Sequence, residues 1–450
     1  MNKFIYIILF VLALPGLLFP GREVEAKKFT LIRDAETESV LLSFAKPLFQ
    51  VANQTTDSIK IYIVKNASLN AFVAGGSNIF VHTGLITSSE SVAQLIGVLA
   101  HEVGHIEGGH LSRLARAQKK TSTYILLGTL MGGAAALLGN PSAATALVSG
   151  GYHIGNRELL SFSRSHELAA DRAALRYLDK LNLSANGLYK FLKLLSHQEL
   201  LSVKQQDPYV RTHPPNKQRM DVISSHLARS KYSNSRPPKH MSKSYDRIKA
   251  KLAAFLNPTK ITLKRYPDSN KSIGARYARA IAYYRQPNFE KANKLIQNLI
   301  NEFPKDPYFL ELSGQIFFEN GYSEKAQLYY GKALKLRPDS SLIRADLAVV
   351  QLESGKKPAI LEAIKNFEIS LMEQPKRPLI WRQLGIAYGK INKMGESAAA
   401  LAEEALLLGA YKDAMRLAKR AKENLTIDSP KWIRADDINR FAKHKLGKSK

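Results

Sequence analysis

The chain of 450 residues contains no cysteine. This absence excludes disulfide bonds, thiolate metal ligands and a cysteine nucleophile. Acidic residues are also scarce, with 38 Asp and Glu against 66 Lys and Arg, which gives a formal net charge of +28. Such a surplus favours contact with anionic surfaces, among them lipid headgroups, lipopolysaccharide, nucleic acid and acidic proteins. No compact basic and aromatic motif of a nucleic-acid-binding module is present, so we expect no nucleic-acid partner.

Charge of either sign is missing between Lys120 and Arg157. The segment Tyr124 to Gly151 is rich in small residues and is split by an Asn140-Pro141 turn. Its first half is shorter than the roughly 20 residues of a membrane-spanning helix, so we expect a helical hairpin. Two interpretations follow: a buried or loosely packed insert in a larger domain, or an element that contacts a membrane or guards the substrate.

The N-terminus has the pattern of an export signal. Lys3 precedes an apolar run from Phe4 to Phe19, and Val24 and Ala26 take the small-residue positions before a cleavage site. Residues 1–26 are therefore interpreted as a cleavable signal peptide, which places the rest of the chain in the periplasm, with membrane association as an addition. An uncleaved membrane anchor is the alternative interpretation.

Hydrophobic periodicity predicts a mainly α-helical protein with a small β-sheet. The alternating segment Ile59 to Val64 predicts a strand, and Asn70 to Ile86 predicts a strand pair around Gly75. Helical patterns cover Ser91 to about Lys120, Arg164 to Leu181 and Ala185 to Leu200. We assign residues 27–229 to one domain. Residues 230–272, rich in Ser, Lys, Arg and Pro at their start, are expected to form a solvated linker and a short connecting helix.

A repeat follows from residue 273 to residue 450. Pro304 and Pro338, like Gly321 and Gly355, are separated by one 34-residue period, and the segment that begins at Trp381 matches W-x2-L-G-x2-Y. This period and these residues are typical of tetratricopeptide (TPR) repeats, which are paired helices. We expect roughly four repeats and a capping helix near the C-terminus. Their concave surface is the predicted site for peptides or protein partners.

The segment "HEVGH" contains the spacing H-E-x-x-H at His101, Glu102 and His105. Residues four apart share one face of a helix, so both imidazoles can reach one metal ion. Glu102 points about 100° away from His101 and can take a proton from a water molecule beside the ion. Zinc suits such a site because it accepts imidazole and carboxylate ligands. The spacing predicts a peptidase centre with one zinc ion per chain.

A peptidase zinc also needs a third protein ligand. Glu167 and Asp171 are four residues apart in "SRSHELAAD". Glu167 can ligate the ion, while Asp171 can orient a ligand histidine through its second ring nitrogen. An ordinary solvated acidic pair beside Arg164 and Arg172 is the alternative.

The motifs "NAFVAGGSNIFVHTGLI", "HEVGH", "SRSHELAAD" and "THPPNKQR", in this order and followed by TPR repeats, resemble gluzincin peptidases of the HtpX and BepA type. The similarity covers nearly the whole mature chain. It implies a zincin-type metallopeptidase domain followed by an all-α TPR solenoid, with Glu167 as the third zinc ligand. Ala169 stands where the family usually carries a further acidic residue.

Other histidines stand near these motifs. His110 is one residue out of register with the third histidine of metzincins, so a capping or structural role is expected. His166 points to another helix face.

His213 lies in a proline-stiffened loop. It either stabilises the oxyanion of the reaction or occupies the fourth zinc position and keeps the enzyme latent. Arg219 is expected to brace the same region. Phe72 to Ala74 is the candidate edge for pairing with an extended substrate.

The resemblance implies a periplasmic endopeptidase that acts on misfolded or misassembled envelope proteins, with Glu102 and His213 in catalysis. Envelope protein-assembly partners are expected on the TPR domain. Two alternatives stay open: a chaperone or assembly factor with latent proteolysis, and an integral membrane protease.

Overall fold

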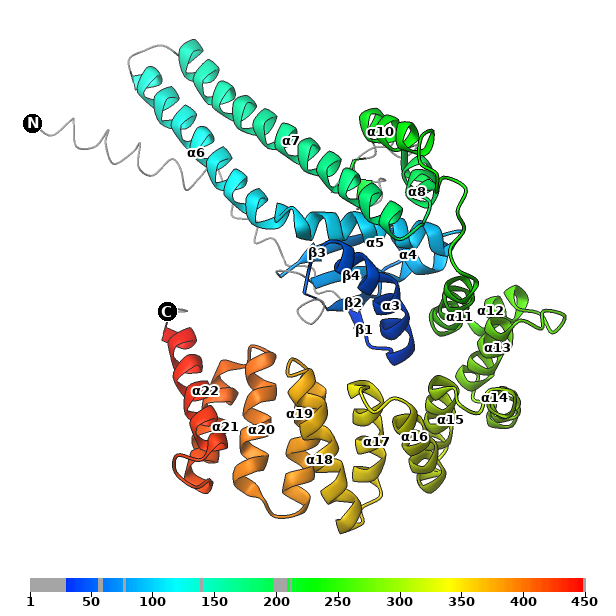
Figure 1. Cartoon of the computed structure of the whole chain (residues 1–450). Helices are drawn as coiled ribbons and strands as arrows, with labels where there is room; N and C mark the ends of the chain where they lie inside the picture. The colour runs from blue at the N-terminus through cyan, green and yellow to red at the C-terminus, as the bar shows by residue number, and fades with distance from the viewer. Residues whose placement is uncertain are drawn as a thin grey trace, which may run out of the picture.

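The computed structural model describes residues 30–55, 60–75, 78–137, 141–196, 209–210, 213–214 and 216–447. The predicted signal peptide lies outside these residues. The protein is mainly α-helical with one small sheet, as the sequence predicts, and its helical repeats form a curved row beside the N-terminal domain (Figure 1).

The sheet contains four short strands in the order β1-β2-β4-β3. They are β1 (Leu31–Ile32), β2 (Ile61–Val64), β3 (Ala71–Ala74) and β4 (Asn78–His82). β2 and β4 are parallel, while the other two pairs are antiparallel. The predicted strand pair around Gly75 is confirmed as β3 and β4, and Gly75 has the positive φ of +59° that glycine adopts most readily.

Three helices pack with the sheet: α3 (Ala35–Val51), α4 (Thr83–Ser88) and α5 (Val92–Glu107). Asp34 caps the N-terminus of α3, and its carboxylate accepts a hydrogen bond of 2.7 Å from the backbone N–H of Thr37. The apolar run of α5 fills the core, with Leu95, Val98 and Leu99 fully buried. The centre of α5, where the histidine motif stands, is therefore held from several sides.

The helix predicted from Ser91 to Lys120 is interrupted. α5 ends at Glu107, and α6 (His110–Leu137) begins after Gly108 and Gly109. Gly109 has φ +58°, a left-handed conformation that ends the first helix. The helix predicted from Arg164 is also longer than expected, because α7 spans Pro141–Lys180. α6 and α7 pack together as an antiparallel hairpin that extends away from the domain body (Figure 1).

The interpretation of this hairpin as an insert that is either buried or loosely packed is wrong only for the buried form. Leu126 and Leu130 on α6 are 58% and 61% exposed, and Ile154 on α7 is 59% exposed. These apolar residues lie on the part of the hairpin that extends away from the N-terminal domain, so the core of that domain does not bury them.

Beyond the hairpin, α8 (Asn186–Ser196) packs on α5, and α10 (Lys217–Leu227) packs on α7 and α8. α11 (Lys239–Leu256) and α12 (Thr259–Arg265) follow in the segment expected to be a linker. α11 contains the short helix that was expected to follow the solvated start of this segment, but the burial of this helix was not anticipated. Tyr245, Ile248 and Leu252 are buried in the core of the N-terminal domain, and Ala250 and Ala254 are buried in the core of the first repeat.

The repeats are helix pairs, as the period predicts: α13 (Ile273–Arg285) with α14 (Phe289–Glu302), α15 (Pro307–Glu319) with α16 (Ser323–Leu336), α17 (Ser341–Glu353) with α18 (Lys357–Glu373), and α19 (Pro378–Lys390) with α20 (Met394–Leu407). α21 (Tyr411–Asn424) and α22 (Pro430–Gly447) complete the row. Gly314 permits close packing within one pair, because a Cβ there would lie 2.7 Å from the ring of Tyr330.

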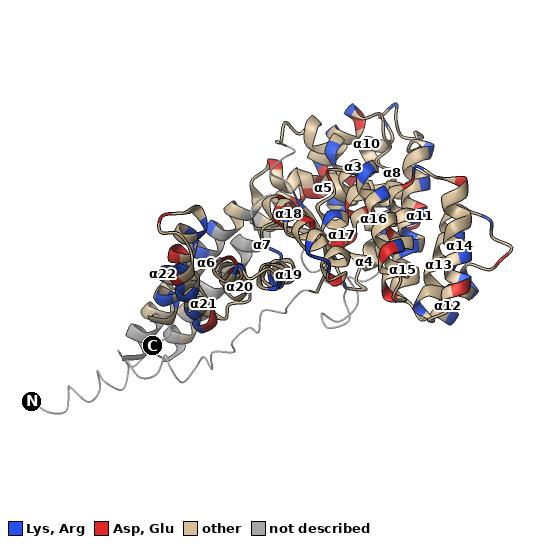
Figure 2. Ribbon diagram, turned by 90° about the horizontal axis from the view of Figure 1, so that it is seen from below, with Lys and Arg blue, Asp and Glu red and all other residues tan. Residues whose placement is uncertain are grey.

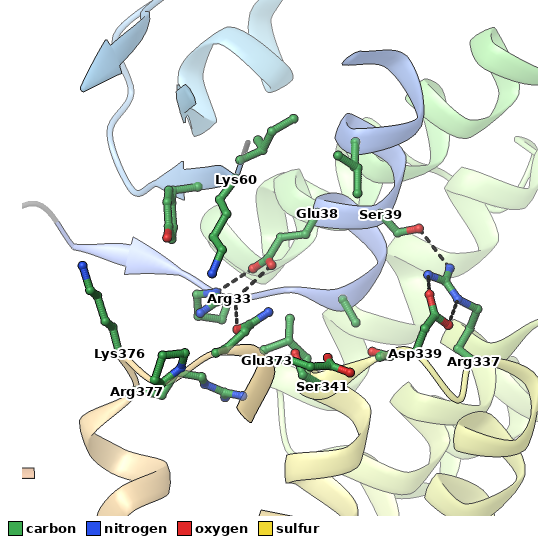
Figure 3. A pocket seen from close by; sticks show the side chains of 18 of the residues that line it. Arg33, Glu38, Ser39, Lys60, Arg337, Asp339, Ser341, Glu373, Lys376 and Arg377 are labelled. Atoms are coloured by element: carbon green, nitrogen blue, oxygen red, sulfur yellow. Dashed lines mark hydrogen bonds and ion pairs between the residues drawn. The ribbon is translucent and has the colours of Figure 1, made fainter. Parts of the chain in front are cut away.

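Charged contacts fix the repeats against the N-terminal domain. Lys251 of α11 lies 2.5 Å from Asp34 and 3.2 Å from Glu36, both near the start of α3. Arg33 pairs with Glu38 and donates to Gln374, which directly follows α18. Arg33, Glu38 and Gln374 line a cavity of about 520 Å³ between the two parts (Figure 3). These long-range contacts set the orientation of the TPR row.

Candidate metal centre

Three parts of the chain build the histidine-rich site. α5 supplies His101, Glu102 and His105; α7 supplies Glu167 and Asp171; and His213 with Arg219 comes from the loop before α10 and its first turn. α5 and α7 approach closely at Gly104, where a Cβ would lie 2.7 Å from the backbone oxygen of Ala170. Only glycine allows this approach without a shift of one helix.

Four side chains offer one ligand atom each to a common point. The Nε2 atoms of His101 and His105 are 3.0 Å apart. Glu167 Oε2 lies 3.2 Å from His101 Nε2, and Glu167 Oε1 lies 3.3 Å from His105 Nε2. His213 Nδ1 lies 3.4 Å from His101 Nε2. All four ligand atoms are within 4.8 Å of one another.

These separations match one small cation in the centre. Four donors at about 2.1 Å from a tetrahedral zinc ion lie about 3.4 Å from each other. The separations observed between neighbouring donors run from 3.0 to 3.4 Å. Two imidazole nitrogens that are 3.0 Å apart, with the buried carboxylate of Glu167 beside both, form the kind of donor set that zinc accepts. The residues therefore fit the metal that the sequence predicts.

Asp171 and Arg219 hold the first histidine. Asp171 Oδ1 lies 2.8 Å from His101 Nδ1, which leaves Nε2 directed at the cluster. Arg219 is fully buried and binds both oxygens of Asp171, at 2.6 and 2.8 Å. Burial by itself would raise the pKa of Asp171, but the guanidinium of Arg219 outweighs it and lowers that pKa to about 2. The carboxylate thus stays ionised and can accept a hydrogen bond from the Nδ1–H of His101.

Arg219 also fixes the loop that carries His213. Its Nη1 donates to the backbone oxygens of His213 and Pro214, at 3.2 and 3.1 Å, and lies 3.0 Å from Glu167 Oε2. One guanidinium therefore joins the loop, a candidate ligand and the residue that orients His101. The sequence suggested a bracing role for Arg219, but it did not indicate these partners.

Glu102 is fully buried beside the cluster and is not one of its converging donors. Neither of its carboxylate oxygens has a hydrogen-bond partner among the described residues. Burial raises the pKa of this carboxyl group. An acid that is held without hydrogen-bond partners next to a metal position is suited to accept and return a proton.

His213 lies inside the cluster rather than at its rim. It is 7% exposed, its Nε2 lies 3.8 Å from Glu102 Oε1, and its ring stacks on Tyr209 with the centroids 4.6 Å apart. The structure therefore presents His213 as a fourth converging donor. The stacking on Tyr209 was not anticipated from the sequence, although Tyr209 stands only four residues before His213.

His110 and His166 are outside the converging set, as expected. His110 Nδ1 lies 3.0 Å from His105 Nδ1, and its ring stacks on that of His166 with 4.1 Å between centroids. His105 therefore has an imidazole at its second nitrogen, where His101 has a carboxylate. Sequence reasoning gave His110 a structural role but missed this contact.

The candidate substrate edge is at the border of the sheet. Among the described strands, β3 pairs only with β4 and is therefore an edge strand of the sheet. β3 also contacts α5, the helix that carries the histidine motif. An extended peptide added to this edge would run beside the helix of the metal site.

Comparison with known proteins supports this architecture. Residues 32–227 match the model described as Peptidase family M48. These residues form an M48 peptidase domain. The match and the His/Glu cluster together identify the chain as a metallopeptidase.

Curated relatives align with most of this chain. The chain is 25% identical over 415 residues to the "Beta-barrel assembly-enhancing protease" of Yersinia pestis, covering 90% of this chain and 83% of the relative. It is 23% identical over 414 residues to the protein of that name from Escherichia coli (strain K12), with the same two coverages. A solved TPR protein, YrrB, aligns with 39% of this chain and 91% of its own at 15% identity and a TM-score of 0.32.

Within the described part of the chain, no helix is both long and apolar enough to cross a membrane.

Proposed function

We propose that this protein is an exported, zinc-dependent endopeptidase that hydrolyses peptide bonds of misfolded or misassembled envelope proteins. The observation that carries the proposal is the convergence of His101, His105 and Glu167 within zinc-binding distances, with the buried carboxylate of Glu102 beside them. We assign the two histidines and Glu167 as zinc ligands and Asp171 as the residue that orients His101.

Zinc bound at these residues would supply a Lewis acid for the peptide carbonyl and would lower the pKa of water. Glu102 takes a proton from the attacking water and returns it to the leaving amine. Asp171 and Arg219 keep the ring of His101 in the orientation that directs Nε2 at the ion. β3 receives the substrate as an added strand and aligns its backbone with the site.

His213 closes the site in the resting state. Its Nδ1 occupies a fourth converging position, and the loop that carries it is tied down by Arg219. A catalytic zinc site keeps one position open for water or substrate. We therefore favour latency over oxyanion stabilisation as the role of His213 in this conformation, and the loop must move before substrate binds.

The TPR row is the proposed site for substrate or partner proteins. The named relatives are proteases that enhance β-barrel assembly, and we extend this substrate class, outer-membrane proteins, to the present chain. Lys and Arg, whose positions Figure 2 marks along the ribbon of both the N-terminal domain and the repeats, give the chain its formal net charge of +28, and this charge favours acidic partners. Periplasmic localisation follows from the predicted signal peptide.

A second candidate function is that of a periplasmic chaperone or assembly factor with latent proteolysis. The position of His213 favours it, because a site closed by its own fourth donor is inactive until it opens. In that case binding of partner proteins would not depend on Glu102.

The test combines metal analysis with cleavage of casein by the purified wild-type protein and by Glu102→Gln. We expect about one zinc per chain in both proteins, and cleavage only by the wild type. Glu107→Gln is the matched control, because Glu107 lies on the same helix and pairs with Arg176 and Tyr177 outside the cluster. Equal activity of Glu102→Gln and wild type, or a metal content near zero in both, would overturn the proposed function.

Partner binding separates the two candidates. If Glu102→Gln retains binding of envelope proteins but fails to support their assembly in cells, the protease is the functional form. If Glu102→Gln supports assembly as well as the wild type does, the chaperone function is correct.

A further inference from the structure

On both helices of the α6–α7 hairpin, the charged residues lie near the domain, and the distal part, of about the same length on each helix, carries no charge. α6 carries four cations, Arg113, Arg116, Lys119 and Lys120, and no acidic residue. No charged residue follows until Arg157 on α7. Lys120 stands 17 residues before the end of α6, and Arg157 stands 16 residues after the start of α7. At 1.5 Å per residue, each arm has a distal part of about 25 Å without charge.

The distal part of α6 exposes an apolar stripe. Leu126, Leu127, Leu130 and Met131 have the spacing of a single helix face. Their exposed fractions are 58%, 49%, 61% and 56%. α7 adds Ile154, also exposed, from the other arm. Exposed apolar residues that gather on one element, away from any core, mark a surface that contacts another body.

The same face continues into a basic band toward the domain. Arg113, Arg116 and Lys119 lie three residues apart, in register with the stripe that begins at Leu126, and all three are exposed. Arg164 is exposed on α7 in the proximal half of that helix. The hairpin therefore changes from cationic near the domain to apolar farther out, along one continuous surface.

We propose that this hairpin docks the protein on a lipid bilayer with anionic headgroups. The apolar stripe enters the outer part of the acyl region, and the basic band lies at the phosphates. This order of charge along the hairpin matches the order of environments that a protein meets when it enters a membrane surface. Each uncharged arm is shorter than the roughly 30 Å of a bilayer core and contains many Gly, Ser and Thr residues, so the hairpin lies in the interface.

Charge complementarity decides between a membrane and an unfolded apolar polypeptide as the occupant. An apolar polypeptide would bind the stripe alone, and the basic band at a fixed distance from it would have no counterpart. Anionic lipid provides both partners at the required separation. The docking goes beyond the proposed peptidase function and does not depend on cleavage.

The first test places a reporter in the stripe. Met131→Trp is introduced into the chain purified after export, and its fluorescence is measured with vesicles of phosphatidylcholine and phosphatidylglycerol that contain brominated acyl chains. The native tryptophans, Trp381 and Trp432, lie in the repeats and provide the background. We expect vesicle-dependent quenching of the introduced indole beyond that background. Absence of such quenching would overturn the proposal, because the probe reports on the hairpin and not on the N-terminus.

The second test separates the two halves of the surface by vesicle flotation. Leu126→Ser combined with Leu130→Ser should lower binding to the anionic vesicles about tenfold or more. Arg113→Gln combined with Arg116→Gln and Lys119→Gln should remove the preference for anionic over neutral vesicles. Leu328→Ser is the control, because Leu328 is a comparably exposed leucine on α16.

The variants share the N-terminus of the wild type, and their metal content verifies the folded M48 domain. Unchanged flotation of both hairpin variants would contradict the proposal. Equal binding of the wild type to neutral and anionic vesicles would also contradict it. The same holds if the hairpin variants lose binding to unfolded casein but still bind vesicles as the wild type does.

Discussion

His213 Nδ1 lies 3.1 Å from each carboxylate oxygen of Glu167, although the two residues are 46 positions apart in the chain. A histidine that only stabilised an oxyanion would keep away from the ligand set and face the substrate carbonyl. The observed position instead places its ring among the donors, in the way of a substrate.

This relationship predicts the effect of His213→Ala. If His213 closes the site, its removal exposes the fourth position and should increase the rate of casein cleavage by the purified protein. Zinc content should change little, because three ligands remain. A large fall in kcat with an unchanged KM would show that His213 acts on the reaction itself, and the latent state would then need another explanation.

Asp171→Asn should weaken zinc binding by about 10- to 100-fold, because the carboxylate that orients His101 is replaced by an amide. It also removes the charge opposite the buried guanidinium of Arg219. The measurement is competition for zinc against a chelator of known affinity. Asp179→Asn is the control, since Asp179 lies on the same helix and pairs with His226. Equal zinc affinity of the two variants would contradict the assignment.

His110→Ala should also weaken zinc binding, because His105 loses the partner at its second nitrogen. The neutral ring of His105 carries its proton on Nδ1 when Nε2 binds zinc, and His110 Nδ1 can accept that proton in a hydrogen bond. His110→Asn keeps an acceptor and should restore part of the affinity. His166→Ala is informative as well, because it removes the ring stacked on His110 and leaves His110 itself in place. If His110→Asn binds zinc no more tightly than His110→Ala does, the contact of His110 with His105 contributes packing alone and no hydrogen bond.

Gly104→Ala should separate α5 from α7. A Cβ at this position would lie 2.7 Å from the backbone oxygen of Ala170, so one helix must shift. We expect a loss of about 1–3 kcal/mol in the free energy of unfolding and a clear loss of zinc binding, since the ligands come from both helices. Gly331→Ala on α16 tests the specificity, because a Cβ there meets nothing within 4 Å. Chemical denaturation and metal analysis of both variants provide the comparison; similar losses in both would refute the packing argument.

Local patterns were enough to predict several features of the chain. The spacing of His101 and His105 predicts a shared helix face because helical geometry is repetitive. The 34-residue period predicts paired helices because each repeat must bury the same residues against its neighbours. The strand pair around Gly75 follows from alternation and from the turn glycines. These features depend only on residues that are near one another in sequence.

Features that depend on distant contacts were predicted less well. The composition of residues 230–272 predicted a solvated linker and a short connecting helix, but it did not show that this helix, α11, buries Tyr245 and Leu252 against the N-terminal domain. The break at Gly109 was missed, because a glycine within a helical pattern is compatible with either a continuous helix or a C-terminal cap. Local composition does not show which surface a helix will meet.

The sequence by itself determined which residues could bind a metal and the kind of helices that would present them, since these follow from side-chain chemistry and helical periodicity. Only the tertiary structure decided that Arg219 joins Asp171 to the His213 loop, that His110 contacts His105, and that His213 lies among the ligands. These contacts join residues from different helices and loops, and their distances are fixed by the packing of α7 against α5 and α10, which periodicity along the chain does not specify.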